Sequence, residues 1–288
     1  MMRGLEGAPY NMKLSIRSLL ITGCLAALSS PVLADDNDGT VPPVSDAPEG
    51  QDTVTRGVQS PDGLLSLKVT LAMNLSSDLI GQPLSIAPNL YYGINDRFQV
   101  GLIHDGPMRQ QTRPGAGLCL TGSDNGCANV YDNVGLDAMY GVVFGPALHL
   151  SGHGSLYVTS FDAGTVMLAV GVTGKIHLTN TAAVFFDPQI GVQLAKRDTV
   201  DDMLFLPVEF QYQVGLPTTI KLLTGVTGSL STLGDTYEVP VGIGFNRNLD
   251  ATFDIGARFS FDNMLGKQAE GSGRADARSL AVLLNVRL

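Results

Sequence analysis

The sequence predicts an all-β protein: a single closed, antiparallel, up-and-down transmembrane β-barrel of about twelve strands. Glycine accounts for 34 of the 288 residues and is spread along the chain, which favours turns and strands over helices. Only 16% of the residues are charged, yet beyond the N-terminal region no segment offers the roughly 18 uncharged residues of a membrane helix. From Gly63 onward, apolar residues recur at every second position, which is the period of a strand with one apolar face.

Residues 1–34 have the pattern of a bacterial secretory signal peptide. A basic start runs from Met12 to Arg17, an apolar stretch follows, and residues 32–34 form a small-residue cleavage site. Because Met12 is itself a suitable initiator, we expect residues 1–11 to be an over-extended start.

A polar tail follows the signal segment. Residues 21–24 also have the form of a lipobox, so Cys24 would be either lipidated or removed with the signal peptide. Residues 35–62 are rich in Asp and Pro and contain almost no large apolar side chain, a composition typical of disorder. We therefore expect a signal peptide at 1–34, an acidic disordered periplasmic tail at 35–62 and a barrel at 63–288.

The alternation from Gly63 to the C-terminus predicts the individual strands. Their outward positions contain no Asp, Glu, Lys or Arg, as contact with lipid requires. The predicted strands span 65–75, 90–94, 98–102, 136–144, 148–158, 166–176, 184–194, 204–214, 220–226, 239–245, 253–261 and 280–288.

The connections between these strands alternate in length. Short turns are predicted at 95–96, 145–146, 179–181, 216–217 and 248–250. Longer polar segments lie between them, at 76–83, 105–132, 160–164, 196–202, 231–236 and 262–276. Short periplasmic turns and long extracellular loops define bacterial outer-membrane barrels, whereas a soluble sandwich has no reason to sort its loops in this way.

Over residues 63–288 the sequence resembles the bacterial outer-membrane β-barrel class. The chain ends inside its last strand, and Leu284, Val286 and Leu288 look like the C-terminal signal read by the barrel-assembly machinery. That family signal usually ends in Phe, whereas this chain ends in Leu. The resemblance implies a location in the bacterial outer membrane, with outer-membrane lipids and the barrel-assembly machinery as partners.

The inward face of the predicted barrel is polar and nearly balanced in charge. Twelve strands lie between the roughly eight that side chains can fill and the sixteen or more of open porins. We therefore predict a narrow porin-like channel for passive diffusion of small solutes; the alternative is a structural or adhesive barrel with a filled lumen that acts through its extracellular loops. The candidate pore-lining residues are Lys68, Arg97, Asp137, His149, His153, Lys175, His177, Asp187, Glu209, Lys221, Asp254 and Arg258.

Cys119 and Cys127 flank a polar segment in the longest loop. In an exported chain such a pair indicates one disulfide that closes the tip of the loop. A metal site is disfavoured because no His or third Cys lies close by. The net charge of −9 disfavours nucleic-acid binding, and the sequence has no phosphate loop or dinucleotide fingerprint, so we expect no metal and no cofactor.

One motif raises the possibility of an enzyme. His149 and Ser151 have the His-x-Ser spacing of the twelve-stranded outer-membrane phospholipases, and positions i and i+2 of a strand share a face. The neighbouring residues lack that family's Asn before His and Asn-Gly after Ser. His149 is also predicted to face inward at the periplasmic end, whereas the phospholipase site lies toward the outer leaflet. We therefore predict that the chain is not an enzyme.

Overall fold

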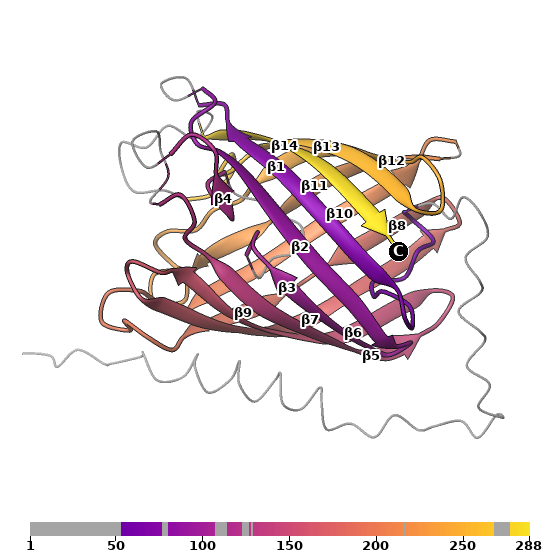
Figure 1. Ribbon diagram of the computed structural model, residues 1–288, viewed down its shortest axis with the longest axis horizontal. Coiled ribbons are helices and arrows are strands. Elements are labelled where there is room, and N and C mark those ends of the chain that lie inside the picture. The colour runs from indigo at the N-terminus through magenta and orange to yellow at the C-terminus, as the bar shows by residue number, and fades with distance from the viewer. Residues whose placement is uncertain are drawn as a thin grey trace, which may run out of the picture. The chain divides into compact units, whose positions relative to one another are not determined.

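The computed structural model describes residues 53–76, 80–106, 114–122, 127, 129–215, 217–267 and 277–288, all of which belong to one compact unit. These residues form a ring of tilted strands (Figure 1). Within these ranges, no helix is long and apolar enough to cross a membrane. The predicted signal peptide, the lipobox cysteine and residues 35–52 of the predicted tail lie outside the described residues.

The strands follow one another along the chain with the predicted period. Their bounds are β1 (Leu65–Asn74), β2 (Leu84–Asn95), β3 (Phe98–Ile103), β4 (Leu118–Cys119), β5 (Val134–Phe144), β6 (Leu148–Ser160), β7 (Thr165–Thr179), β8 (Ala182–Phe186), β9 (Gln189–Gln193), β10 (Met203–Gln213), β11 (Thr218–Ser229), β12 (Val241–Asn248), β13 (Phe253–Phe261) and β14 (Arg278–Arg287).

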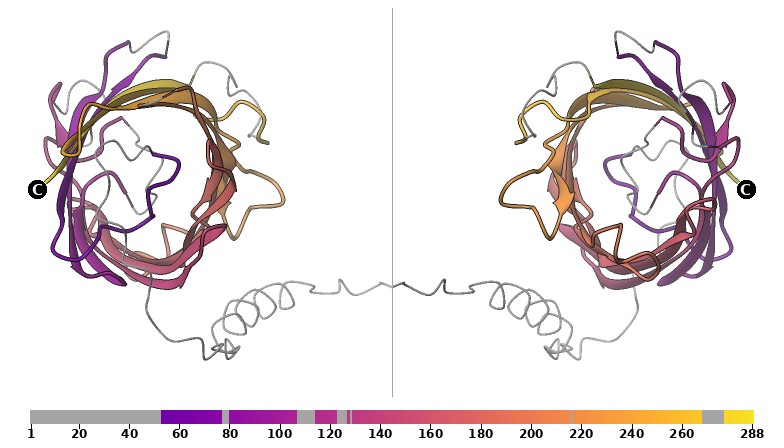
Figure 2. Two further views of the ribbon diagram at one scale, coloured as in Figure 1. Left: turned by 90° about the vertical axis from the view of Figure 1, so that its right-hand side faces the viewer. Right: turned by 90° about the vertical axis from the view of Figure 1, so that its left-hand side faces the viewer.

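These segments make a closed barrel of twelve antiparallel strands. Neighbours in the chain are neighbours in the sheet, and β1 pairs with both β2 and β14, which closes the ring seen in the end-on views (Figure 2). The segments β8 and β9 both pair with β7 and β10 and are two halves of one barrel strand, while β4 is a short addition beside β2. The predicted fold is therefore confirmed.

The interruption between β8 and β9 has a local cause. Pro188 has no N–H to donate to a ladder, and Asp187 and Pro188 bond irregularly instead: Asp187 N donates to Pro207 O at 3.2 Å, and Val172 N donates to Pro188 O at 3.0 Å. Gly171 makes room for this detour, because a Cβ there would lie 2.1 Å from Pro188 O. The break also buries the Asp187 carboxylate.

Polar and apolar side chains alternate between the two faces of the barrel wall, as β10 illustrates. Glu209, Gln211 and Gln213 are buried, whereas the intervening Phe210 and Tyr212 are exposed. This distribution is opposite to that of a soluble protein and places the polar side chains in the interior and the apolar ones on the outer surface.

The connections divide the barrel into two ends. We call the end with the tight connections after β2, β5, β7, β10 and β12 the short-turn end. Both ends of the barrel sheet meet there, because Leu65 N donates to Leu288 O at 3.0 Å and Leu288 N donates to Leu65 O at 2.8 Å. The longer connections lie at the opposite end.

Residues 53–62, which we call the strap, are ordered and lie inside the ring of strands. In both end-on views the indigo segment that precedes β1 runs within the circle of strands (Figure 2). Val54 is fully buried, and Lys175 Nζ donates to the carbonyl oxygens of Thr53 and Arg56, each at 2.7 Å. The prediction of a disordered tail is therefore wrong for these ten residues, because hydrogen bonds and an ion pair supply the contacts that their apolar content could not.

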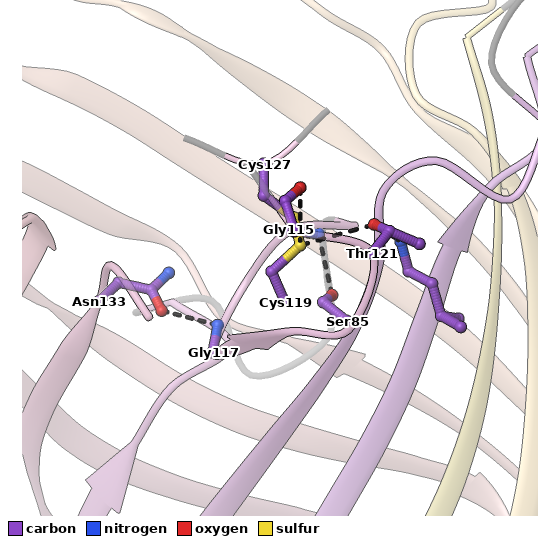
Figure 3. The surroundings of a disulfide bond; sticks show 9 residues. Ser85, Gly115, Gly117, Cys119, Thr121, Cys127 and Asn133 are labelled. Atoms are coloured by element: carbon purple, nitrogen blue, oxygen red, sulfur yellow. Dashed lines mark hydrogen bonds between the residues drawn. A yellow bond between two sulfur atoms is a disulfide. The ribbon is translucent and has the colours of Figure 1, made fainter. Parts of the chain in front are cut away.

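Part of the long connection between β3 and β5 lies beside the first residues of β2 and extends the wall there. β3 stops at Ile103, and β4 pairs with β2 through Ser85 and Ile86. Cys119 and Cys127 form a disulfide next to this pairing (Figure 3). The described part of the connection is thus part of the barrel wall, and the disulfide lies beside a strand pairing.

Candidate functional site in the barrel interior

The interior at the short-turn end is organised around the carboxylate of Asp254 on β13. Its Oδ2 lies 2.7 Å from Arg56 Nη1 and 2.6 Å from Arg287 Nη1, and it accepts a hydrogen bond from Asn285 Nδ2 at 3.1 Å. The Asp254 side chain is 6% exposed and that of Arg287 is 12% exposed. One carboxylate therefore holds the strap and β14 together.

A second charged group lies on β10 and β11. Glu209 Oε1 lies 3.0 Å from Lys221 Nζ and accepts a hydrogen bond from Gln211 Nε2 at 2.5 Å. Arg258 on β13 interacts electrostatically with Glu209 and with Asp105. Opposite charges therefore meet on this wall, and each side chain remains at the inward position that the alternation predicts.

A third group surrounds His153 on β6. His153 Nε2 contacts Asp137 on β5, and its Nδ1 lies 3.8 Å from Asp187 Oδ1. Asp187 in turn accepts hydrogen bonds from Thr173 Oγ1 at 2.5 Å and from Gln189 Nε2 at 2.7 Å. The three ionisable side chains are at most 1% exposed, so this group forms a packed part of the wall.

Lys68 on β1 is tied to the connection that follows β3. Its Nζ lies 3.2 Å from Asp105 Oδ2. The neighbouring His104 donates its backbone N–H to Asn89 Oδ1 at 2.7 Å and accepts a hydrogen bond from Tyr157 Oη at its carbonyl oxygen, at 2.9 Å. These bonds hold the Asp105 segment against the wall, so Lys68 faces a fixed acidic partner.

The remaining predicted residues lie near the short-turn end. A β-bulge between Gly141 and Val143 shifts the register, so that Phe144 pairs with His149 and shares its inward face. Strict alternation over the predicted strand 136–144 puts Phe144 on the outward face together with Leu136, and the bulge shows this prediction for Phe144 to be wrong. His149 and His177 lie edge to face, with ring centroids 5.1 Å apart. Arg97 is exposed at the rim, with its Cζ 5.8 Å from the centroid of the Phe144 ring.

The His-x-Ser pair does not form a catalytic arrangement. The His149 ring contacts Phe144 and His177, and Ser151 Oγ has no hydrogen-bond partner among the described residues. Activation of a serine requires its hydroxyl within hydrogen-bond reach of the base. The described residues also contain no group of three or more His, Cys, Asp or Glu side chains that could hold a metal ion.

The structure thus brings the predicted residues together in separate groups. Asp137, His153 and Asp187 meet; Glu209, Lys221 and Arg258 meet; and His149 and His177 meet. No role was predicted for Arg56, and no ion pair was predicted for Asp105. A single basic residue inside an acidic segment was the one available signal for Arg56.

The segment around Cys119 is hydrogen-bonded to two other parts of the chain, the start of β2 and Asn133. Gly115 N donates to Ser85 Oγ at 2.8 Å, Leu84 N donates to Thr121 Oγ1 at 3.2 Å, and Gly117 N donates to Asn133 Oδ1 at 2.7 Å (Figure 3). The disulfide therefore lies in a segment that is bonded to β2 at one end of the barrel wall. The C-terminal residues of the predicted assembly signal form the end of β14 and its pairing with β1.

One exposed carboxylate lies between two of the long connections. Asp201 Oδ2 accepts hydrogen bonds from Ser231 Oγ at 2.5 Å and from Ser229 Oγ at 2.7 Å. These two bonds favour the charged form and lower the pKa of Asp201. The connection after β9 is thereby joined to the end of β11.

Comparisons with known proteins identify the same fold. No family model matches the sequence, and no curated protein matches it. The NanC porin is similar with a TM-score of 0.57 at 8% sequence identity, over 77% of this chain and 100% of that one. The KdgM porin in complex with disordered oligogalacturonate is similar with a TM-score of 0.52 at 10% identity, over 77% of this chain and 98% of that one. At this identity the similarity establishes the fold alone, a closed antiparallel β-barrel like those of these two porins.

Proposed function

We propose that this chain is a narrow channel of the bacterial outer membrane through which small polar solutes diffuse passively. The observation that carries the proposal is the combination of a closed twelve-strand wall with an interior lined by charged and amide side chains. Such a wall can solvate a polar solute on its way through an apolar membrane. Twelve strands also enclose more space than the roughly eight that side chains alone fill.

The similar solved structures support this proposal. Both are named as porins, and one is in complex with an oligogalacturonate, so barrels of this strand number serve as porins in those proteins. The solute of the present chain is proposed only as small and polar, because its inward basic and acidic groups are largely paired with one another. The barrel-assembly machinery and outer-membrane lipids remain the proposed partners of the folding chain.

One observation favours the alternative of a filled barrel that acts through its long connections. Asp137, His153 and Asp187 are packed with almost no exposure, and the strap occupies part of the interior. A barrel filled to the same extent along its whole length would admit no solute. Solute entry therefore distinguishes the two functions.

The test is a swelling assay in proteoliposomes. Vesicles that contain the protein are placed in isosmotic pentose, hexose, trisaccharide and dextran. The proposed channel should let pentose and hexose enter, so that the vesicles swell, and should exclude dextran. The assay is run on the intact chain and on the chain without residues 53–62, each with the heat-modifiable gel mobility of a folded barrel. Swelling of both no faster than that of protein-free vesicles in every sugar would contradict the channel.

A further inference from the structure

We propose that the strap is a plug that closes the short-turn mouth of the lumen, with Arg56 and Lys175 as its two anchors, and that solutes pass when it leaves. The gating rests on the proposed channel function. The position of the strap does not, so the two can be tested separately.

The strap runs across the lumen between two distant places on the barrel wall. Arg56 contacts Asp254 on β13, and Lys175 on β7 holds the strap carbonyls of Thr53 and Arg56. Between β13 and β7 the sheet runs through β12, β11, β10 and the β8/β9 strand, so these two contacts lie far apart around the ring. Arg56 joins both places, because Lys175 holds its carbonyl oxygen and Asp254 holds its guanidinium, and the strap runs into the opening of the ring (Figure 2).

The second part of the strap continues along the opposite arc of the wall. Gln59 Nε2 donates to Arg97 O at 2.8 Å, and Ser60 N donates to Gln99 Oε1 at 2.6 Å. Pro61 passes so close to β2 that a Cβ on Gly93 would lie 1.9 Å from its carbonyl oxygen. The wall therefore has a glycine at the point where the strap presses against it.

The strap can leave the lumen without breaking the pairing of the barrel strands. The hydrogen bonds and the ion pair that hold the strap join it to side chains and rim carbonyls, and they belong to no strand ladder. Ladder-type bonding begins only after it, where Gly63 N donates to Gly93 O at 2.9 Å. Val54 is its one fully buried apolar side chain, and water can replace polar contacts at low cost.

The end of the strap also has a hinge. Gly63 has a φ of +70°, and a Cβ there would meet no atom within 4 Å. This residue adopts a left-handed conformation in open space, so rotation of its backbone meets little steric resistance. The strap can therefore swing about the first residue of the barrel while β1 stays paired with β2 and β14.

The position of the strap is tested with a single reporter thiol. A cysteine in place of His149 lies behind Gly57, whose Cβ position is 3.6 Å from His149 Nδ1. Cys119 and Cys127 are paired, so H149C is the reactive thiol within the described barrel. Deletion of residues 53–62 should raise the rate of its reaction with a charged, membrane-impermeant thiol reagent roughly tenfold, because reactivity follows access. Deletion of residues 37–46, of equal length, should leave the rate unchanged.

The gating is tested on the same proteins, without the reporter, in planar bilayers. The chain lacking 53–62 should be open for a fraction of time roughly tenfold larger than the intact chain, and R56Q should give a smaller increase in the same direction. R56K keeps the charge but cannot bind both oxygens of Asp254 as Arg56 does, so its open fraction should lie between those of the intact chain and R56Q. Heat-modifiable gel mobility identifies the versions that fold. If the chain without residues 53–62 does not fold, R56Q provides the test of gating.

The outcomes separate the two proposals. Equal labelling rates in the intact and strap-deleted chains would overturn the position of the strap. Faster labelling with equal currents would overturn the gating, and the channel would remain. Faster labelling with no current from any folded version would overturn the proposed channel and the gating together.

Discussion

Arg56 and Asp254 lie 198 positions apart in the sequence and form an ion pair in which Nη1 and Oδ2 are 2.7 Å apart. Arg287 reaches the same oxygen at 2.6 Å. A single carboxylate on β13 therefore holds the strap to the wall and fixes the end of β14, the strand that closes the barrel with β1.

This relationship predicts that Asp254→Asn destabilises the folded barrel. The change leaves two guanidinium groups without their shared carboxylate, and we expect a loss of roughly 2–3 kcal/mol in the free energy of unfolding. Urea unfolding in detergent micelles measures it. The matched control is Asp235→Asn, since Asp235 is 88% exposed and lies 4.0 Å from Lys267, and its loss should have no measurable effect. Equal stability of the two variants would contradict the role of Asp254.

Gly117 provides a test of the wall beside β2. Its φ is +74°, and a Cβ there would lie 2.5 Å from Ile86 O. Gly117→Ala should therefore cost about 1 kcal/mol for the left-handed backbone and a further 1–3 kcal/mol for the contact with backbone atoms. Gly81→Ala, with φ +77° and no atom within 4 Å, should show only the first cost. In thermal unfolding, the midpoint temperature of Gly117→Ala should be lower than that of Gly81→Ala. The opposite order would show that β4 does not pack against β2.

The disulfide should hold β4 in place. Replacing both Cys119 and Cys127 with Ser removes a short covalent loop and should cost about 2.5 kcal/mol by the chain-entropy relation. Hydrogen exchange should rise at the amide of position 119, which donates to Val130 O, and at Leu120 N, which donates to Leu84 O. Exchange at Leu206 N, within β10, serves as the internal control and should not change. Unaltered exchange at the two loop amides would contradict a stabilising role for the disulfide.

The pKa of Asp201 gives a pH prediction outside the membrane-spanning strands. Because the Ser231 and Ser229 hydroxyls lower this pKa in the folded state, their contribution to stability is present above the ordinary Asp pKa and is lost as the pH falls through the lowered value. Ser231→Ala should raise the pKa more than Ser229→Ala, and the double variant should return it toward the ordinary range. Carboxyl carbon NMR measures the titration. Identical titration in all four proteins would contradict these hydrogen bonds.

The charges of the lumen should set the ion selectivity of the channel. Replacing Lys68, Lys175 and Arg258 with Gln removes three positive charges from the interior. Asp105, which lies beside Lys68, and Glu209, which interacts with Arg258, then lose part of their compensation. This should shift the permeability ratio toward cations by roughly twofold to fivefold, read from the reversal potential in a salt gradient. Lys267→Gln changes a half-exposed side chain beyond the end of β13 and should leave the ratio unchanged. An unchanged ratio in the triple variant would show that these cations do not face the permeating solution.

The strand arrangement could be predicted because each strand has its own alternation of apolar and polar residues. The alternation in β10 follows from the requirement for apolar atoms toward lipid, and turn lengths separate the two ends. Two deviations depend on single local events: the detour at Pro188 and the bulge that turns Phe144 inward. Alternation alone predicts neither, because the polar and apolar pattern does not show how the backbone bonds around Pro188 or where the register of β5 shifts.

The interior could be predicted as a set of residues but not as a set of contacts. The inward position of Asp254 follows from the phase of β13, whereas its pairing with Arg56 depends on where a segment with no periodicity folds back. Composition favoured disorder for residues 53–62 because they bury little apolar surface. The barrel supplies polar partners for them instead, and this information lies in strands that are distant in the sequence.

Current recording in a planar bilayer tests the central claim, that the polar interior of the twelve-strand barrel conducts, most directly. The protein is extracted from membranes, shown to be folded by its heat-modifiable gel mobility, and studied with and without residues 53–62. Stepwise currents are expected from both versions, brief in the intact chain and sustained in the strap-deleted one. Silence of both folded versions at every voltage and salt concentration would contradict the channel.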